Sequence, residues 1–522
     1  MKIPRPLALW ALLALAAALP CASARALAAQ TFPTNDRVVR NMWNQGMGSG
    51  SQVYRLGQAL LDSIGPRLTG TPGQEASVEW ALKQYAGWGV PARKEQYGTW
   101  KGWRRGHTRL ELLAPRYREL EATMLGYSPP SQGPVEGTVV LLPQLPDSAA
   151  YDRWMAGLRG ELVMISPAEI TCRPDDNWTQ LATPATTQRI FAEQDSVARQ
   201  WSRRLQAAGR NLAGRLDRSG AAAILSTTWS GGWGVNKVFD SSNERVPEVD
   251  LSCEDYGLLY RLSANNQGPR LRLDAQAEFL GERPSYNVIA EMTGTQLPNE
   301  YIVIGAHFDS FDSSSGATDN GTGTLMMMEA MRILKATYPN PKRTIIVGHW
   351  GAEEMGLIGS GSFAADHPEV SEGLQIGFNQ DNGTWRIEAI RMQGFNKAEA
   401  QVQGWLDRMP REIADTVNFT SPMTEGGSDH TSFACRGAPF VRLQSNYPDY
   451  RQYTWHTNRD SFDKISFDDL KNNATLIAML AYMASEDPVR VSRERDPLAA
   501  DAQGRVPTRP ACGRPQRSYP GN

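Results

Sequence analysis

The sequence predicts an α/β fold in which a mostly parallel, mixed sheet is sandwiched by helices and a second domain is inserted into the chain. Two observations support the core: apolar runs of strand length recur from Tyr286 onward, and helical patterns separate them. Strands that are apolar on both faces and alternate with helices are typical of a parallel sheet buried on both sides. The third observation is a change of character in mid-chain, where shorter strand-like runs alternate with polar, tryptophan-bearing segments.

The first residues have the pattern of an export signal. Two basic residues precede an apolar run over residues 7–19, and small residues then allow cleavage after Ala24 or Ala28. The run is shorter than the roughly 20 apolar residues that a bilayer span needs. We therefore expect residues 1–28 to be a signal peptide and the protein to be exported, either secreted or periplasmic, without a membrane span.

Two regions of different character follow the signal. Residues 29–131 are expected to form the N-terminal part of the main domain, with helices on both sides of the loop RLTGTPG at residues 67–73. Residues 132–283 are expected to form the inserted domain. Its strand-like runs are GTVVLLP, GELVMIS and AAAILST, at residues 137–143, 160–166 and 221–227.

The α/β core is expected over residues 284–487. Its strands are predicted at NVIAEM, YIVIGAH, RTIIVGHW, LQIGFNQD and APFVRLQ, which are residues 287–292, 301–307, 343–350, 374–381 and 438–444. Helices are predicted at residues 320–336 and, at the end of the core, at residues 467–484. Residues 488–522 are rich in Arg, Asp and Pro and are expected to be an extended or disordered C-terminal tail.

The balance of charge argues against one class of partner. The chain holds 54 Lys and Arg residues against 56 Asp and Glu residues, and it has no long basic block. Domains that bind nucleic acid usually carry a basic patch or stripe. A nucleic-acid partner is therefore not expected.

Four cysteines lie beyond the signal, at Cys172, Cys253, Cys435 and Cys512. Exported proteins keep disulfides, and an even number of cysteines permits two bridges. The pairing does not follow from spacing. A bridge between Cys172 and Cys253 is favoured because both lie in the segment assigned to the inserted domain. No pair has the CxxC spacing of a structural zinc site.

Metal-binding residue types stand at the ends of the predicted core strands. His307 closes YIVIGAH, and Asp381 closes LQIGFNQD. The pair Glu353 and Glu354 follows RTIIVGHW. Because the carboxyl ends of parallel strands meet at one edge of a sheet, these side chains are expected to share one site. Imidazole and carboxylate are ordinary zinc ligands, so the site is predicted to hold zinc.

Two aspartates extend this site. Asp319 ends a Ser- and Gly-rich loop at the start of the next helix, in HFDSFDSSSGATDNGTG. A carboxylate has two oxygens, so Asp319 is predicted to bridge two zinc ions. Asp309 lies two residues after His307, and it is expected to accept the other imidazole proton and fix the tautomer of the ring.

The two adjacent glutamates have different predicted roles. Neighbouring side chains point in different directions, so Glu354 is predicted to bind metal while Glu353 stays free as the general base and acid. Asp381 and His456 are each predicted to complete the ligand set of one zinc ion. His456 lies in the segment YTWHTNRDSFDKI. The prediction is thus two zinc ions per chain, with a bound water that Glu353 activates for attack on a carbonyl.

These motifs, in this order, resemble those of the co-catalytic di-zinc exopeptidases, a family typified by bacterial leucyl aminopeptidases and by plasma glutamate carboxypeptidase, also called carboxypeptidase Q. The resemblance covers most of the chain. IGPRLTGTPG is similar to the N-terminal part of that carboxypeptidase, and residues 132–283 resemble its protease-associated-type domain. The resemblance implies the zinc exopeptidase fold and the hydrolysis of short peptides, as an aminopeptidase or as a carboxypeptidase Q-like dipeptidase.

The resemblance also implies roles for single residues. The residues matching His307 and Asp381 hold the first zinc in the family, those matching Glu354 and His456 hold the second, and the one matching Asp319 joins them. His430, in GGSDHTSF, matches the side chain that stabilises the tetrahedral oxyanion, although some relatives use Tyr near this place. A cis peptide bond is implied between Asp319 and Asn320.

The inserted domain stands between the N-terminal helices and the first core strand. From that position we expect it to lie over the metal edge of the sheet as a lid and to restrict access to short peptides.

Two other classes of function share the fold. One is a zinc acyltransferase of the glutaminyl cyclase type, which works with one metal, and the complete ligand set for two ions argues against it. The other is a catalytically inactive binding relative, and the retention of Glu353 argues against that. The sequence leaves open which end of the peptide is recognised, and it is compatible with a homodimer.

Overall fold

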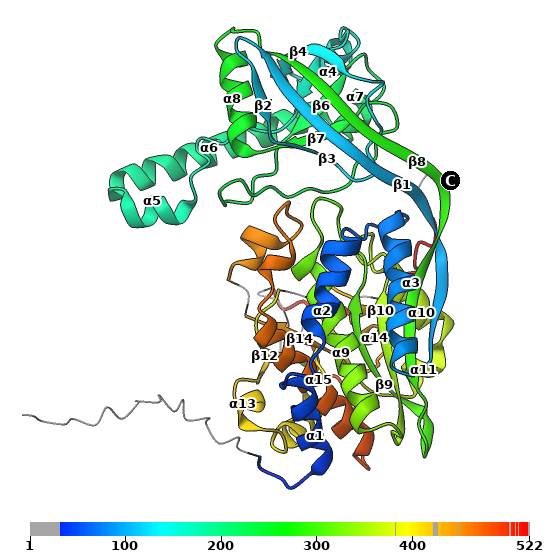
Figure 1. Ribbon diagram of the computed structural model, residues 1–522. Coiled ribbons are helices and arrows are strands. Elements are labelled where there is room, and N and C mark those ends of the chain that lie inside the picture. The colour runs from blue at the N-terminus through cyan, green and yellow to red at the C-terminus, as the bar shows by residue number, and fades with distance from the viewer. Residues whose placement is uncertain are drawn as a thin grey trace, which may run out of the picture.

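The computed structural model describes residues 32–519 except 382, 421–425, 447, 499, 501, 502, 507 and 510. The predicted signal peptide, residues 1–28, lies outside the described residues. Figure 1 shows a lower α/β unit and an upper unit that two long strands join to it.

The lower unit contains the mostly parallel sheet that the sequence predicts. Its central strands are parallel and lie in the order β14 (Phe440–Ser445), β11 (Leu374–Gln380), β9 (Leu297–His307) and β10 (Arg343–Trp350). Antiparallel strands flank them: β8 (Arg270–Met292) pairs with β10, and β12 (Ile387–Arg391) pairs with β14, with β13 (Asn418–Thr420) at the edge. The mixed α/β fold is therefore confirmed.

Both faces of this sheet are buried because successive side chains of a strand enter different cores. On β9, Ile302 and Ile304 join the core on one face, and Val303 joins the core on the other. The first core is closed by α1 (Arg37–Gly46), α2 (Val53–Gly57), α3 (Pro72–Gly87), α9 (Thr322–Thr337), α12 (Glu399–Leu406), α13 (Arg411–Ala414) and α15 (Phe467–Glu486). The second is closed by α10 (Ile358–Asp366), α11 (Pro368–Glu372) and α14 (Thr431–Ala434).

Helix α9 is buried along almost its whole length, between the sheet and helices α1 and α15. Its methionines Met326, Met327, Met328 and Met331 have no exposed surface. The flexible thioether side chain suits such a position because it fills irregular gaps between several elements. In the described part of the chain, no helix combines the length and the apolarity of a membrane span.

The upper unit is built on two long strands. β1 (Ala92–Ala114) and β8 pair antiparallel and rise out of the lower sheet (Figure 1). β8 also pairs with β4 (Val135–Leu141), which begins a short parallel sheet with β5 (Leu162–Met164), β6 (Ala223–Ser226) and β7 (Glu248–Leu251). β2 (Arg118–Leu120) pairs with β1, and β3 (Ala122–Met124) pairs with β7. Strands that precede residue 132 thus also join the upper unit.

The helices of the upper unit are α4 (Ser148–Met155), α5 (Asp175–Leu181), α6 (Pro184–Ala208), α7 (Leu212–Leu216) and α8 (Cys253–Ala264). α5 and part of α6 project sideways as an arm (Figure 1). A disulfide joins Cys172 to Cys253, which confirms the favoured pairing. Short irregular helices are η1 (Gln58–Ile64), η2 (Ala317–Gly321), η3 (Asn396–Ala398), η4 (Tyr450–Thr454) and η5 (Phe462–Lys464).

The C-terminal segment after α15 is extended, and several contacts hold the described part of it. A disulfide joins Cys512 to Cys435. Arg517 forms an ion pair with Asp366 at 2.8 Å, and the backbone nitrogen of Thr99 donates to the carbonyl of Arg517 at 2.9 Å. Because Thr99 lies on β1, the segment reaches from the lower unit to the strand that leads into the upper one.

Candidate metal centre

The carboxyl ends of the parallel strands gather the predicted ligands. His307 is the last residue of β9, and Asp381 directly follows β11. Glu353 and Glu354 lie in the turn after β10. Asp319 lies in η2, at the mouth of α9. His456 follows η4, on the segment between β14 and α15.

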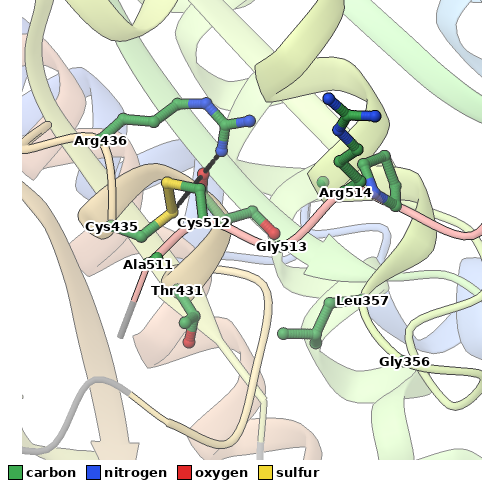
Figure 2. A pocket seen from close by; sticks show the side chains of 12 residues that line it. Gly356, Leu357, Thr431, Cys435, Arg436, Ala511, Cys512, Gly513 and Arg514 are labelled. Carbon is green, nitrogen blue, oxygen red and sulfur yellow. Dashed lines mark hydrogen bonds between the residues drawn. A yellow bond between two sulfur atoms is a disulfide. The ribbon is translucent and has the colours of Figure 1, made fainter. Parts of the chain in front are cut away.

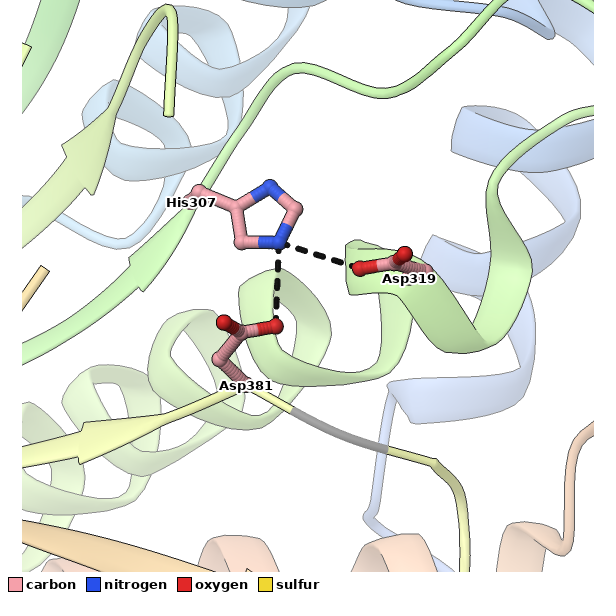
Figure 3. A group of neighbouring side chains, drawn as sticks. All are labelled: His307, Asp319 and Asp381. Atoms are coloured by element: carbon pink, nitrogen blue, oxygen red, sulfur yellow. Dashed lines mark hydrogen bonds and ion pairs between the residues drawn. The ribbon is translucent and has the colours of Figure 1, made fainter. Parts of the chain in front are cut away.

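Two groups of three donors form here and share one residue. The first consists of His307, Asp319 and Asp381, and the second of Asp319, Glu354 and His456. In the first group, Nε2 of His307 lies 3.2 Å from Oδ1 of Asp319 and 3.1 Å from Oδ1 of Asp381 (Figure 3).

The second group has the same form around the other oxygen of Asp319. Nε2 of His456 lies 3.2 Å from Oδ2 of Asp319 and 3.0 Å from Oε2 of Glu354. The carboxylate of Asp319 therefore faces one imidazole with each oxygen. All the ligand positions predicted from the sequence come together in these two groups.

These distances can be compared with the edges of a zinc tetrahedron. Zn–N and Zn–O bonds near 2.0–2.1 Å put neighbouring ligand atoms roughly 3.3 Å apart. The four imidazole-to-carboxylate distances are within about 0.3 Å of that value. Oε1 of Glu354 is buried and has no hydrogen-bond partner among the described residues, so a cation would satisfy it. The donor set fits zinc.

The electrostatics of this cluster also favour the binding of a cation. Burial alone would lower the pKa of His456, but the carboxylates of Glu354 and Asp319 raise it to about 10. Burial raises the pKa of Glu354 to about 7, with the neighbouring Asp319 adding to the effect. Carboxylates crowded in a buried site resist ionisation unless positive charge neutralises them.

Asp309 supports both glutamates. Nδ1 of His307 lies 3.1 Å from the backbone carbonyl of Asp309 but 3.8 Å from its carboxylate. That carboxylate instead accepts the backbone N–H groups of Glu353, at 3.0 Å, and of Glu354, at 3.3 Å. Both parts of Asp309 therefore contact residues of the site, and the carbonyl is the nearer acceptor for the imidazole.

Two buried charged residues, which sequence reasoning missed, hold the loop that carries Asp319. The guanidinium of Arg67 donates to the carbonyls of Phe308, at 2.8 Å, and Gly316, at 3.0 Å. The carboxylate of Asp460 accepts the backbone N–H of Asp319 at 3.0 Å. The peptide bond from Asp319 to Asn320 is cis, as the resemblance implies. Arg67 lies within RLTGTPG, which was the available signal.

A pocket of about 330 Å³ opens beside the metal donors. Its lining includes Glu353, the predicted base, together with Arg442, Tyr450, Arg451 and Trp455. The last four were not identified from the sequence because they come from β14 and from the segment around η4, which the fold brings to the strand ends.

His430 has a different position. It is fully buried at the start of α14, and it is not among the residues that line the pocket. Burial lowers the pKa of His430 to about 3, so its imidazole is neutral. Tyr450, by contrast, lines the pocket, and burial raises the pKa of its phenol.

A second, smaller pocket of about 160 Å³ shares Gly356 and Leu357 with the first. The disulfide between Cys435 and Cys512 and the side chains of Arg436 and Arg514 lie around it (Figure 2). The C-terminal segment therefore lies close to the turn that carries Glu354 and that also lines the metal pocket.

The upper unit also contacts this region. The backbone nitrogen of Val238 donates to the carbonyl of His456 at 2.9 Å, and the ring of Phe239 packs edge-on against the imidazole of His456. The backbone nitrogen of Asn458 donates to the carbonyl of Asn236 at 3.0 Å. Residues 236–239 thus lie against the segment that presents a metal donor.

Comparison with known proteins finds similar peptidases. Residues 287–481 match the model of Peptidase family M28. Carboxypeptidase Q of Mus musculus is 23% identical over 457 residues, which are 86% of this chain and 89% of that protein. Aminopeptidase YwaD of Bacillus subtilis is 29% identical over 266 residues, which are 49% of this chain and 56% of that one.

Solved structures share the fold. A Peptidase M28 precursor from Shewanella amazonensis superimposes with a TM-score of 0.64 at 24% identity, over 88% of this chain and 98% of that one. BSAP, a zinc aminopeptidase from Bacillus subtilis, superimposes with a TM-score of 0.53 at 19% identity, over 85% and 96%. The family match over residues 287–481 and these relatives show that the protein is a peptide hydrolase similar to the zinc exopeptidases of peptidase family M28.

Proposed function

We propose that the protein is an exported exopeptidase that uses two zinc ions to hydrolyse short peptides. One observation carries the proposal: two groups of three donors share the carboxylate of Asp319. Each group leaves room for further ligands, as catalytic zinc sites do. His307 and Asp381 would hold one ion, Glu354 and His456 the other, and Asp319 both. A zinc pair bound there would polarise the scissile carbonyl and make a water nucleophilic near neutral pH.

Glu353 has the position of the general base. It lines the pocket beside the donors, and it belongs to neither donor group. Its backbone is fixed by the carboxylate of Asp309. Burial raises the pKa of Glu353 well above its usual value, which suits a group that takes a proton and returns it to the leaving nitrogen.

Tyr450 supplies the donor for the developing oxyanion in this proposal. Its phenol lines the pocket, and its raised pKa keeps the proton that such a donor needs. His430 stays the candidate that the sequence favours. Comparing Tyr450→Phe with His430→Ala tests the two: the residue that acts on the oxyanion should lower kcat by about 100-fold or more, and the other should not.

The domain assignment and the export are part of the same proposal. We take residues 132–283 as a protease-associated-type lid. The contact of residues 236–239 with the segment around His456 supports this assignment.

The size of the pocket bears on the substrate. A pocket of about 330 Å³ is small for a binding site, which favours short peptides. The two disulfides suit an oxidising compartment.

The test is metal content together with activity. The purified protein should contain two zinc ions per chain by elemental analysis, and a chelator should abolish the hydrolysis of dipeptides, which added zinc should restore. Full activity of a metal-free preparation would overturn the proposal. Formation of pyroglutamate without release of amino acids would indicate the acyltransferase, and zinc binding without any hydrolysis would indicate an inactive relative.

A further inference from the structure

Two arginines in the metal pocket have no part in the proposed chemistry. Arg442 lies on β14, and Arg451 lies in η4; both line the pocket beside the donors. Neither forms an ion pair with a carboxylate in the described part of the chain. Exposed arginines often lack a partner, but two of them in one small pocket with a metal centre need a physical reason.

Arg442 is in contact with a metal donor. In the register of the sheet, Arg442 on β14 pairs with Asn379 on β11, two residues before Asp381. One guanidinium nitrogen, Nη2, donates to the backbone carbonyl of Asp381 at 2.9 Å. Nε of Arg442 is buried and has no partner among the described residues. The guanidinium is thus fixed beside the metal site with N–H groups left for a ligand.

Arg451 is held at the rim by an aromatic ring. Its guanidinium carbon lies 4.3 Å from the ring centroid of Trp455, and that ring stacks on the imidazole of His456 at 4.0 Å. Nζ of Lys237, which comes from the upper unit, lies 4.3 Å from the same ring of Trp455. Burial and the nearby Arg451 both lower the pKa of Lys237. Cationic side chains therefore gather beside a metal donor, and no carboxylate among the described residues forms an ion pair with them.

The carboxylates that line the pocket already have roles in the proposed function. Of the described residues that line it, the carboxylates are Asp319, Glu353, Glu354 and Asp381, and each serves the metals or the base. No carboxylate of this lining is left to pair with the ammonium group of a peptide. The guanidinium groups of Arg442 and Arg451 also line the pocket, and a bound anion would neutralise them.

We propose that Arg442 and Arg451, with Lys237 at the rim, bind the free α-carboxylate of the substrate, so that the enzyme recognises the carboxyl end of a short peptide. This rests on the proposed function. A guanidinium binds a carboxylate with two parallel N–H donors, which fixes orientation as well as position. With the carboxylate held there, the last peptide bond lies at the metal donors. Hydrolysis adds the hydroxyl of water to the carbonyl carbon and a proton to the leaving nitrogen, and it releases the C-terminal amino acid.

The experiment compares substrates that differ only in the terminal carboxylate. Zinc-loaded full-length protein is assayed with leucyl-leucine, with its C-terminal amide, and with leucine p-nitroanilide. The free dipeptide should have the highest kcat/KM, by at least about tenfold. Loss of a hydrogen bond to a charged group weakens binding by about this factor. In Arg451→Gln and Arg442→Gln, the ratio of kcat/KM for the free dipeptide to that for the amide should fall by about tenfold, mainly through KM.

Controls separate binding from folding. Arg189→Gln removes an exposed arginine on α6, and it should leave the ratio unchanged. Zinc content and the melting temperature show whether each variant is folded. Should Arg442→Gln not fold, product inhibition gives the same information: leucine should inhibit the wild-type protein about tenfold more strongly than leucinamide does, and Arg451→Gln should reduce that difference.

The outcomes distinguish this inference from the function on which it rests. Zinc-dependent cleavage of the amide and the anilide as fast as the free dipeptide, with the same ratio in both variants, would overturn carboxylate recognition and leave the proposed peptidase intact. Absence of zinc-dependent hydrolysis with all substrates would overturn both.

Discussion

Glu353 and Glu354 are neighbours in sequence, but the structure gives them different surroundings. Oε2 of Glu354 lies 3.0 Å from the imidazole of His456, whereas Glu353 belongs to neither donor group. Glu353→Gln should therefore keep the zinc content and lower kcat by about 100- to 10,000-fold, because only proton transfer is lost. Enzyme kinetics and elemental analysis measure the two quantities. Glu278→Gln, on an exposed part of β8, is the matched control, and near-normal turnover in Glu353→Gln would show that the base is misassigned.

Asp460 tests whether the loop of Asp319 must be held for zinc to bind. Its carboxylate accepts the backbone N–H groups of Thr318, at 2.8 Å, and Asp319, at 3.0 Å. Asp460→Asn places an amide nitrogen where one of these acceptors was. We expect a loss of about 1 to 3 kcal/mol in unfolding free energy and weaker zinc binding.

Denaturant titration and competition with a coloured chelator measure these effects of Asp460→Asn. Asp195→Asn, on the exposed side of α6, is the control and should change neither quantity. Unchanged zinc affinity in Asp460→Asn would mean that the loop keeps its position without this acceptor.

At the scale of elements, the strands of the core were the most predictable part of the fold. The runs at residues 301–307, 343–350 and 374–381 coincide closely with β9, β10 and β11, because strands buried on both faces are apolar throughout. The site residues at the ends of these three runs were predictable for the same reason, whereas Asp319 and His456 lie outside them and were assigned from the order of the motifs. His307, Asp381 and the glutamate pair needed no knowledge of distant contacts.

The long strands β1 and β8 could not be predicted in the same way. Charged and polar residues occur along both strands, and their burial follows no steady alternation. Their length depends on pairing with each other, with bulges at several points, and that is a tertiary contact. Arg67, Asp460 and Arg442 were missed for a related reason: each acts on the site through an element far away in the sequence.

The C-terminal segment is an element whose attachment can be tested. The bridge between Cys435 and Cys512 joins residues 77 positions apart and ties the segment to α14. Closing a loop of that length restricts the unfolded chain, and such bridges typically contribute about 2 to 4 kcal/mol. Replacing both cysteines with serine should lower the unfolding free energy by that amount, measured with zinc present. Cys512→Ser alone should lose as much, because it opens the same loop; a double variant as stable as the wild type would remove the bridge as a source of stability.

At the scale of the whole molecule, the upper unit meets the lower one close to the metal donors. Residues 229–236 form a small hairpin in which Trp229 and Asn236 are bridged, and this hairpin lies on η4. Nε2 of Gln452 donates to the carbonyl of Gly231 at 2.9 Å. Because η4 also carries Arg451 and leads to His456, the hairpin is placed to limit how far a peptide can extend beyond the pocket.

This arrangement predicts how activity depends on peptide length. For peptides with the same two C-terminal residues, kcat/KM should fall by more than about tenfold from the dipeptide to the hexapeptide, since a steric cost of ~1.4 kcal/mol already gives that factor. Replacing residues 230–235 with two glycines should raise the rate for the hexapeptide and leave the rate for the dipeptide nearly unchanged, because the metal donors and the pocket arginines are retained. Initial rates with purified, zinc-loaded proteins measure both. If the hexapeptide were cleaved as fast as the dipeptide by the unaltered protein, or if the shortened hairpin slowed both substrates equally, the upper unit would not act as a lid.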